Sequence, residues 1–396
     1  MKTARSHTNA LRPTLSLLFL PLMVVLAGCT WFSAPEQPSA VGVVISPHAH
    51  SAQPDISRVL EALEPGLRSE SMFAIVESDG VPSVVQVERM PNEMGFSSAD
   101  WESYRSEVDS KVRAALEGTV ADYPETAPLE AITKTVRQLD PALPRIVHYM
   151  GSGLQTTGSL PMHEGQLYLD PADIAEFLED SEQLPDLSGV TIHLHGLGSV
   201  AGDQPPLDLP ATTRLEALWV TVLERAGATV VLEQAPLPDA PAAELPPVSI
   251  VQLRESAALP GADFRCERTE LGDAVLSFQP DSAEYVDPIH AHETLSSIAQ
   301  RLEGCPGPFV VLAGTSSAGT AESRQIVATA RTERVAEDLA AMSSLDRSQF
   351  TTIPAAMDHC GFTPDRDASG QLLLDIAATN RMVVIFAAGN PDMHCL

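Results

Sequence analysis

Short apolar runs alternate with amphipathic stretches through the first half of the chain. The runs have the length and β-branched content of strands, and they cover residues 41–46, 72–76, 83–87, 145–150, 190–195 and 228–232. Helical spacing appears at residues 98–116, 129–139 and 212–226, and another helix is expected to begin at Asp170-Pro171. Asp79-Gly80 indicates a hairpin. Strands separated by helices predict a mostly parallel, open α/β sheet covered on both faces.

A proline-rich stretch then divides the chain, because residues 235–247 contain five prolines. Beyond it, strand-like runs at 275–283, 309–313, 350–353 and 381–386 alternate with predicted helices at 290–302 and 322–342. We therefore predict two domains, of the α/β and α+β classes. The first covers residues 41–234, a Pro/Ala-rich linker follows at 235–262, and the second domain covers 263–396.

The first thirty residues have the pattern of a targeting segment. Lys2, Arg5 and Arg12 precede an apolar run from Leu15 to Leu26 that is short for a membrane span. The run ends in Leu26-Ala27-Gly28-Cys29, which resembles a bacterial lipobox. The resemblance implies that residues 1–28 are a signal peptide and that Cys29 is acylated. Residues 29–40 would then be a tether between the lipid and the first domain.

The charge balance restricts the partners of the chain. Asp and Glu number 53 against 24 Lys and Arg, which gives a formal net charge of −29. So acidic a surface argues against nucleic acid and against an anionic membrane surface as partners. It is compatible with an exported protein of the cell envelope.

Four cysteines remain besides Cys29, and all lie in the second domain. An even number in an exported chain favours two disulfides, although spacing alone does not determine how they pair. We predict the pairs Cys266–Cys305 and Cys360–Cys395, each flanking strands of the second domain. No Cys-x-x-Cys pair occurs, so these cysteines do not indicate a structural zinc site.

The segments of the second domain follow a recognisable order. Phe278-x-x-x-x-Ala283 precedes a predicted helix, Gly314–Gly319 follows the strand at 309–313, and Asn380-Arg381-Met382-Val383-Val384-Ile385 opens the last strand. In order and spacing this is similar to the peptidoglycan-associating domain of the OmpA family. The resemblance implies an OmpA-like βαβ sandwich whose partner is peptidoglycan.

The same resemblance implies where the ligand binds. In the family a Gly-x-Thr-Asp-x-x-Gly loop supplies an aspartate and the next helix an arginine, which together bind the ammonium and carboxylate of a diamino acid. Aligned on Gly319, these positions fall on Ser316 and Arg331. Arg331 keeps the guanidinium that suits a carboxylate. Ser316 accepts a hydrogen bond but brings no charge for the ammonium.

The first domain resembles a von Willebrand factor A-type domain in its arrangement of strands and helices. Where that family has a metal-binding Asp-x-Ser-x-Ser loop, this chain has Ser46-x-His48-x-His50, without the aspartate. A zinc site formed by His48, His50 and either His148 or His193 is an alternative prediction. The other interpretation is that these histidines are polar residues at strand ends.

Sequence signatures of catalysis are lacking. The chain has no Gly-x-Ser-x-Gly elbow, and the glycine-rich loop after residue 195 is followed by Pro205-Pro206 where a dinucleotide site needs a helix N-terminus. We therefore predict a lipid-anchored envelope protein that is not an enzyme, uses no cofactor and associates with peptidoglycan. Its first domain would recruit an unknown protein partner. The alternative is an exported metal-dependent or carbohydrate-acting enzyme that uses the His-x-His pairs.

Overall fold

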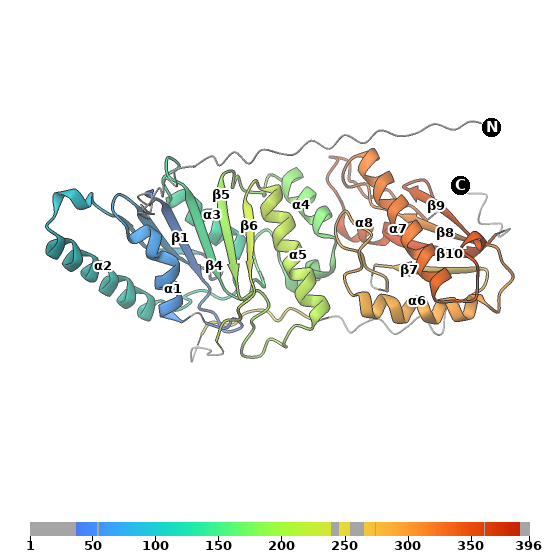
Figure 1. Cartoon of the computed structure of the whole chain (residues 1–396), viewed down its shortest axis with the longest axis horizontal. Coiled ribbons are helices and arrows are strands. Elements are labelled where there is room, and N and C mark those ends of the chain that lie inside the picture. Colours follow the sequence, from blue (N-terminus) through green and yellow to red (C-terminus); the bar gives the residue numbers. More distant parts are fainter. Residues whose placement is uncertain are drawn as a thin grey trace, which may run out of the picture. The chain divides into compact units, whose positions relative to one another are not determined.

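The structure, a computed structural model, describes residues 37–53, 55–238, 245–253, 265–273, 275–359 and 361–388 (Figure 1). The predicted signal peptide, Cys29 and most of the predicted tether lie outside the described residues. Two separate β-sheets form, one from each predicted domain, so the predicted α/β and α+β classes are confirmed. Among the described residues, no helix combines the length and apolar character that crossing a bilayer requires.

The first sheet has six strands in the order β3-β2-β1-β4-β5-β6. The strands are β1 (Ala40–Ile45), β2 (Met72–Glu77), β3 (Ser83–Arg89), β4 (Arg145–Met150), β5 (Val190–His195) and β6 (Thr229–Glu233). All neighbours are parallel except β2 and β3, the predicted hairpin. This is the order of doubly wound α/β sheets, with the edge strand β3 reversed.

Helices cover the two faces of this sheet unequally. They are α1 (Ile56–Leu63), α2 (Ser98–Gly118), α3 (Pro128–Gln138), α4 (Pro171–Asp180) and α5 (Leu209–Arg225). Helices α3, α4 and α5 bury their apolar sides in one core with Val44, Tyr149 and Ile192. Helices α1 and α2 pack on the opposite face, mainly against β1 and β2. The prediction of a sheet covered on both faces therefore holds for its β1–β2 half.

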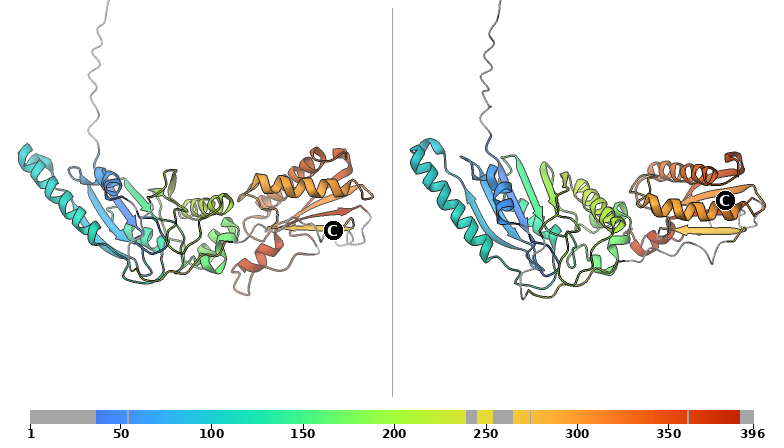
Figure 2. Two further views of the ribbon diagram at one scale, coloured as in Figure 1. Left: turned by 90° about the horizontal axis from the view of Figure 1, so that it is seen from below. Right: turned by 60° about the horizontal axis from the view of Figure 1, so that its bottom comes forward.

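The second sheet has four strands in the order β7-β10-β8-β9. They are β7 (Arg268–Gly272), β8 (Phe309–Gly314), β9 (Phe350–Ala356) and β10 (Met382–Ala387), accompanied by α6 (Pro288–Leu302), α7 (Ala321–Ala341) and α8 (Leu374–Asn380). Strands β8 and β9 are parallel, and β10 is antiparallel to both β7 and β8. Helices α6 and α7 lie side by side (Figure 2) and pack on one face of the sheet around Leu295, Phe309 and Ile385.

Two predictions for this domain have clear outcomes. The predicted disulfide Cys266–Cys305 is present, whereas Cys360 and Cys395 lie outside the described residues. The predicted first strand at 275–283 is wrong, because the strand is β7 and the following segment forms turns. Leu276 and Phe278 alternate like strand residues, but they are buried beneath α6 and α7 without strand pairing beyond one bridge, from Phe278 to Tyr285.

The described part of the predicted linker packs against the first domain. Leu237 and Val251 are buried. Gln204 exchanges two hydrogen bonds with the backbone of Val251, and Glu125 accepts bonds from Ser249. This segment therefore extends the surface of the first domain.

Candidate functional site

The loop that follows β8 carries Ser316 and is held on several sides. The amide of Thr315 donates to Ala356 O, and the amide of Ser317 donates to Asp365 Oδ2 at 2.9 Å. Gly319 has φ of 71°, a left-handed conformation that favours glycine and lets the chain turn into α7. Thr320 and Ser323 then form a capping box at the start of that helix. The position of Ser316 is thus fixed by hydrogen bonds on both sides of it in the loop.

Arg331 lies in the middle of α7 and is only 6% exposed. Its Nε donates to Ser282 O at 2.9 Å and its Nη2 to Gln279 O at 3.2 Å, while the guanidinium stacks 4.8 Å from the Phe278 ring centre. Burial lowers the pKa of Arg331 below its usual range, although Asp170 opposes the shift. Arg331 therefore orders the turn that carries Asp281 and brings a desolvated positive charge to the site.

Ser316 contacts a carboxylate from the first domain. Its hydroxyl donates to Asp173 Oδ1 at 2.8 Å, and Asp173 Oδ2 accepts from Nη1 of Arg381. Asp173 is 2% exposed and Arg381 5%, so the ion pair is withdrawn from solvent. Asp170, the N-cap of α4, places Oδ2 3.8 Å from Arg381 Nε.

Burial raises the pKa of the Asp173 carboxyl above its usual range, and Arg381 opposes that shift. Burial also disfavours the charged form of Arg381, but Asp170 and Asp173 outweigh it and raise the pKa of the guanidinium. Because an arginine side chain keeps its proton in proteins, Arg381 stays charged, and its charge is what favours the ionised form of Asp173.

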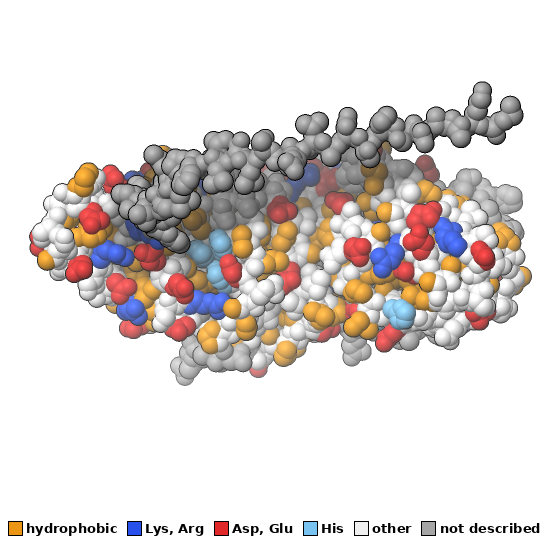
Figure 3. Space-filling view, viewed as in Figure 1, with side chains coloured by type: hydrophobic (Ala, Val, Ile, Leu, Met, Phe, Trp, Pro, Cys, Tyr) orange, Lys and Arg blue, Asp and Glu red, His pale blue; other side chains and the backbone are white. Residues whose placement is uncertain are grey.

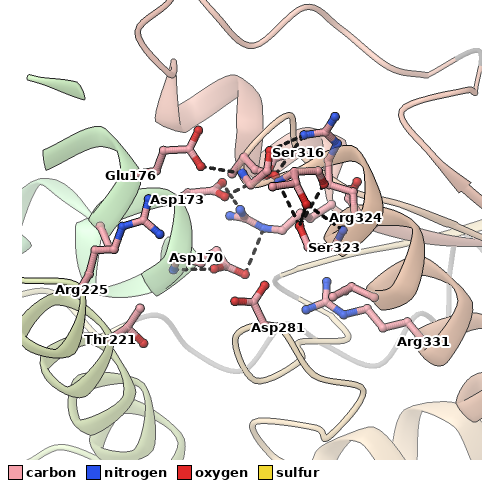
Figure 4. A pocket seen from close by; sticks show the side chains of 18 residues that line it. Asp170, Asp173, Glu176, Thr221, Arg225, Asp281, Ser316, Ser323, Arg324 and Arg331 are labelled. Atoms are coloured by element: carbon pink, nitrogen blue, oxygen red, sulfur yellow. Dashed lines mark hydrogen bonds and ion pairs between the residues drawn. The ribbon is translucent and has the colours of Figure 1, made fainter. Parts of the chain in front are cut away.

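A cavity of about 330 Å³ opens beside this ion pair, between α4 and α5 on one side and the Ser316 loop and α7 on the other. Figure 4 shows Asp170, the N-cap of α4, and Asp173 and Glu176 of α4 facing the loop and the start of α7. Asp281 and Arg331 also line the cavity, as do Arg225 and Arg324. Carboxylates and guanidinium groups therefore face the same small space.

Further polar contacts hold α4 against the second domain. Glu176 accepts from the amide of Gly319 at 2.6 Å and pairs with Arg366, which also bonds Asp180 at 3.1 Å. From α5, Arg214 donates to Ser277 Oγ at 2.6 Å. The acidic side of α4 thus meets arginines of the second domain along its length.

The structure places the two predicted binding residues, Ser316 and Arg331, on the same cavity. Asp170, Asp173 and Arg381 were not predicted to be binding residues. One signal was present in the sequence. Asp173 directly precedes Ile174, a core residue of the amphipathic helix α4, and the Asp173 side chain is buried as well. A buried carboxylate needs a partner, but its partner Arg381 is 208 positions away.

The predicted zinc ligands are not assembled into a site. His48 and His50 follow β1, where the amide of His50 donates to His48 Nδ1 at 3.3 Å. His193 lies on β5 and bonds Glu233 at 3.0 Å. Within the described part of the chain, no group of three or more His, Cys, Asp or Glu side chains is arranged to hold a metal ion.

Three histidines do gather on the less covered face of the first sheet. The His148 ring stacks on His193 with centroids 4.7 Å apart, and its Nδ1 lies 3.0 Å from His195 Nε2. Figure 3 shows histidine side chains together on the surface of the first domain. Burial, reinforced by its histidine neighbours, lowers the pKa of His148 to about 3, and burial lowers that of His195 to about 4. The rings of His148 and His195 are therefore neutral at pH 7.

His48 predicts how the stability of the first domain depends on pH. Burial, and then His50, lowers the pKa of His48 from 6.5 to about 3. Below about pH 6.5 the unfolded chain therefore binds a proton that the folded chain does not, and stabilisation present above that pH is lost as the pH falls toward 3. For this side chain, 1% exposed, the loss between pH 7 and pH 5 is about 2 kcal/mol.

Urea unfolding followed by tryptophan fluorescence measures this effect, since all three tryptophans precede residue 235. Burial raises the pKa of Glu77 to about 7, so protonation of this side chain stabilises the folded protein as the pH falls. This effect is opposite in sign to that of the histidines. The comparison is therefore between variants: the change from pH 7 to pH 5 should be about 2 kcal/mol smaller in His48→Gln than in the wild type. Replacing the exposed His292 by Gln is the control. An unchanged pH dependence in His48→Gln would contradict the assignment.

The chain shows only partial similarity to known proteins. No protein-family model and no curated protein matches the sequence. The structure of the cell wall anchor of the T6SS from Pseudomonas aeruginosa is 25% identical over 30% of this chain and 80% of that chain, with a TM-score of 0.24. The periplasmic domain of Helicobacter pylori MotB is 15% identical over 32% and 80%, with a TM-score of 0.25. The conserved hypothetical protein BatB from Bacteroides thetaiotaomicron is 13% identical over 50% and 89%, with a TM-score of 0.28. Scores this low do not assign the chain to a family.

Proposed function

We propose that this chain is a lipid-anchored protein of the bacterial cell envelope whose second domain associates non-covalently with peptidoglycan. The observation that carries the proposal is the placement of Arg331. It aligns with the arginine position of the OmpA family that the sequence resembles, and it lines a cavity whose walls also carry Asp170 and Asp281. The sequence resemblance over the second domain supports the same reading.

The charges of the cavity suit the free end of a diamino acid in a stem peptide. That end carries an ammonium and a carboxylate on one carbon. Arg331 and Arg324 offer guanidinium groups for the carboxylate, and Asp170 and Asp281 offer acceptors for the ammonium. The volume, about 330 Å³, lies at the small end of ligand pockets, which fits one end of an amino acid better than a sugar chain.

The remaining parts of the proposal follow from the sequence. Acylated Cys29 would hold the chain to a membrane, and residues 29–40 would give it reach toward the cell wall. The first domain would recruit a protein partner, and the chain would act by binding, without catalysis or a cofactor. It would thus form a non-covalent link between membrane lipid and wall.

Retention on purified sacculi tests the proposal through Asp281. This residue is exposed and has φ of 48°, a conformation that asparagine tolerates well. Asp281→Asn therefore removes a charge from the cavity without straining the turn. Loss of one charge-assisted contact should weaken retention by about tenfold. Glu337→Gln, an exposed change on α7 away from the cavity, is the matched control.

Sacculi of two compositions sharpen the experiment. Retention should be stronger on walls with diaminopimelate than on walls with lysine, whose side chain ends in an ammonium without a carboxylate for Arg331. If the wild type fails to sediment with either wall, the proposed function is wrong. If Asp281→Asn and Glu337→Gln are retained equally well on diaminopimelate walls, binding occurs elsewhere on the protein.

A further inference from the structure

A carboxylate from another part of the chain lies beside Ser316, which carries no acid of its own. The hydroxyl of Ser316 donates to Asp173 Oδ1 at 2.8 Å, so a carboxylate from α4 lies within one hydrogen bond of the residue aligned with the family's aspartate. Asp173 is 143 positions earlier in the chain and belongs to the first domain. A carboxylate has about four acceptor sites, and the bonds from Ser316 and Arg381 use one on each oxygen.

Buried polar atoms at the same place lack partners. Nη2 of Arg381 and Oγ1 of Thr315 are buried, and neither has a hydrogen-bond partner among the described residues. Both side chains are at least nine-tenths buried, and both residues line the cavity beside Asp173. Buried donors of this kind are normally satisfied. A polar ligand in the cavity would supply acceptors for them.

From these observations we infer that α4 of the first domain supplies the acidic wall of the ligand site, with Asp173 replacing the acid missing at Ser316 and Asp170 beside it. The inference rests on the proposed function and specifies its site. The ligand is a zwitterionic amino-acid end whose ammonium is directed to Asp170 and Asp173. Its carboxylate is directed to Arg331 and to the unpartnered donors of Arg381 and Thr315. The site is therefore composite, and neither domain contains all of it.

A composite site links binding to the contact between the domains. A ligand that touches Asp170 on α4 and Arg331 on α7 binds only while α4 is docked, so it stabilises the docked arrangement by mass action. Peptidoglycan would then hold the first domain in a fixed relation to the wall. The presentation of the first domain to its own partner would depend on that attachment.

A reciprocal exchange tests the inference in the full chain. Three variants are compared with the wild type for retention on diaminopimelate sacculi: Asp173→Ser, Ser316→Asp, and the double exchange of both. Asp173→Ser removes the acid, and Ser316→Asp places a second carboxylate against Asp173, so each should lose about tenfold or more in retention. The double exchange returns one acid and one hydroxyl to the same contact. It should recover retention to within about threefold of the wild type.

Each outcome bears on the inference. If Asp173→Ser is retained as well as the wild type, α4 does not contribute to the site, while the proposed function stands. If it is retained more strongly, α4 covers the site, and the inference is again wrong. A wild type that does not bind rejects the proposed function and this inference together. Should Asp173→Ser not fold, Asp170→Asn at the cavity wall and the double exchange give the same answer, with thermal melting as the check on folding.

Discussion

Replacing Asp173 by alanine should lower the free energy of unfolding by about 3–5 kcal/mol. The substitution leaves the Arg381 guanidinium, 5% exposed, without its main counter-charge and leaves the Ser316 hydroxyl without its acceptor. A buried charge that loses its partner keeps its desolvation cost, which is why such changes are among the most damaging. Asp170 remains 3.8 Å from Arg381 and should hold the loss near the lower end of that range.

The control removes both charges together. In Asp173→Leu with Arg381→Met, two apolar side chains replace the ion pair, and such replacements are often neutral or stabilising. The double variant should therefore be more stable than Asp173→Ala. Urea unfolding with fluorescence for the first domain and circular dichroism for the whole chain provides the measurement. If Asp173→Ala unfolds within about 0.5 kcal/mol of the wild type, as surface changes do, the pair is not buried in solution.

Local sequence patterns were sufficient to predict most of the strands and helices. Apolar runs such as 145–150 and 190–195 coincide with β4 and β5, and Asp170-Pro171 marks the start of α4. Such signals depend on the spacing of neighbouring residues, and tertiary contacts reinforce them here. The wrong strand at 275–283 shows the limit. Arg268–Gly272 has only one buried apolar residue, Leu271, and is a strand because β10 pairs with it, which no local pattern records.

The candidate site was predictable only on the side of the second domain. Ser316 and Arg331 follow from alignment within one domain and lie on one cavity. Nothing near Asp173 and Glu176 in the sequence indicates their partners Arg381 and Arg366. An ion pair 208 positions apart is set by how the domains pack. Besides the position of Asp173 on its helix, a second hint was Ser316, which stands where the OmpA pattern that the sequence resembles has an acid.

Removing the Cys266–Cys305 disulfide should destabilise the second domain by about 4 kcal/mol. The bridge joins Cys266, just before β7, to Cys305, three residues beyond the end of α6, with a sequence separation of 39. It thereby closes a loop that contains β7 and α6 in the unfolded chain and reduces the entropy gained on unfolding. The pairing of β7 with β10 is the contact most dependent on it, since β7 is a short edge strand with little apolar surface.

The double variant Cys266→Ser with Cys305→Ser removes this disulfide alone, whereas a reducing agent would act on every disulfide of the protein. Hydrogen exchange should rise first in β7 and along β10, while the urea transition reported by tryptophan should stay unchanged, because no tryptophan follows residue 219. The same paired change at Cys360 and Cys395 tests the second predicted bridge under identical conditions. If both domains lose stability equally on removal of Cys266–Cys305, they unfold as one unit. The contact between α4 and the Ser316 loop would then couple the unfolding of the two domains even without a ligand.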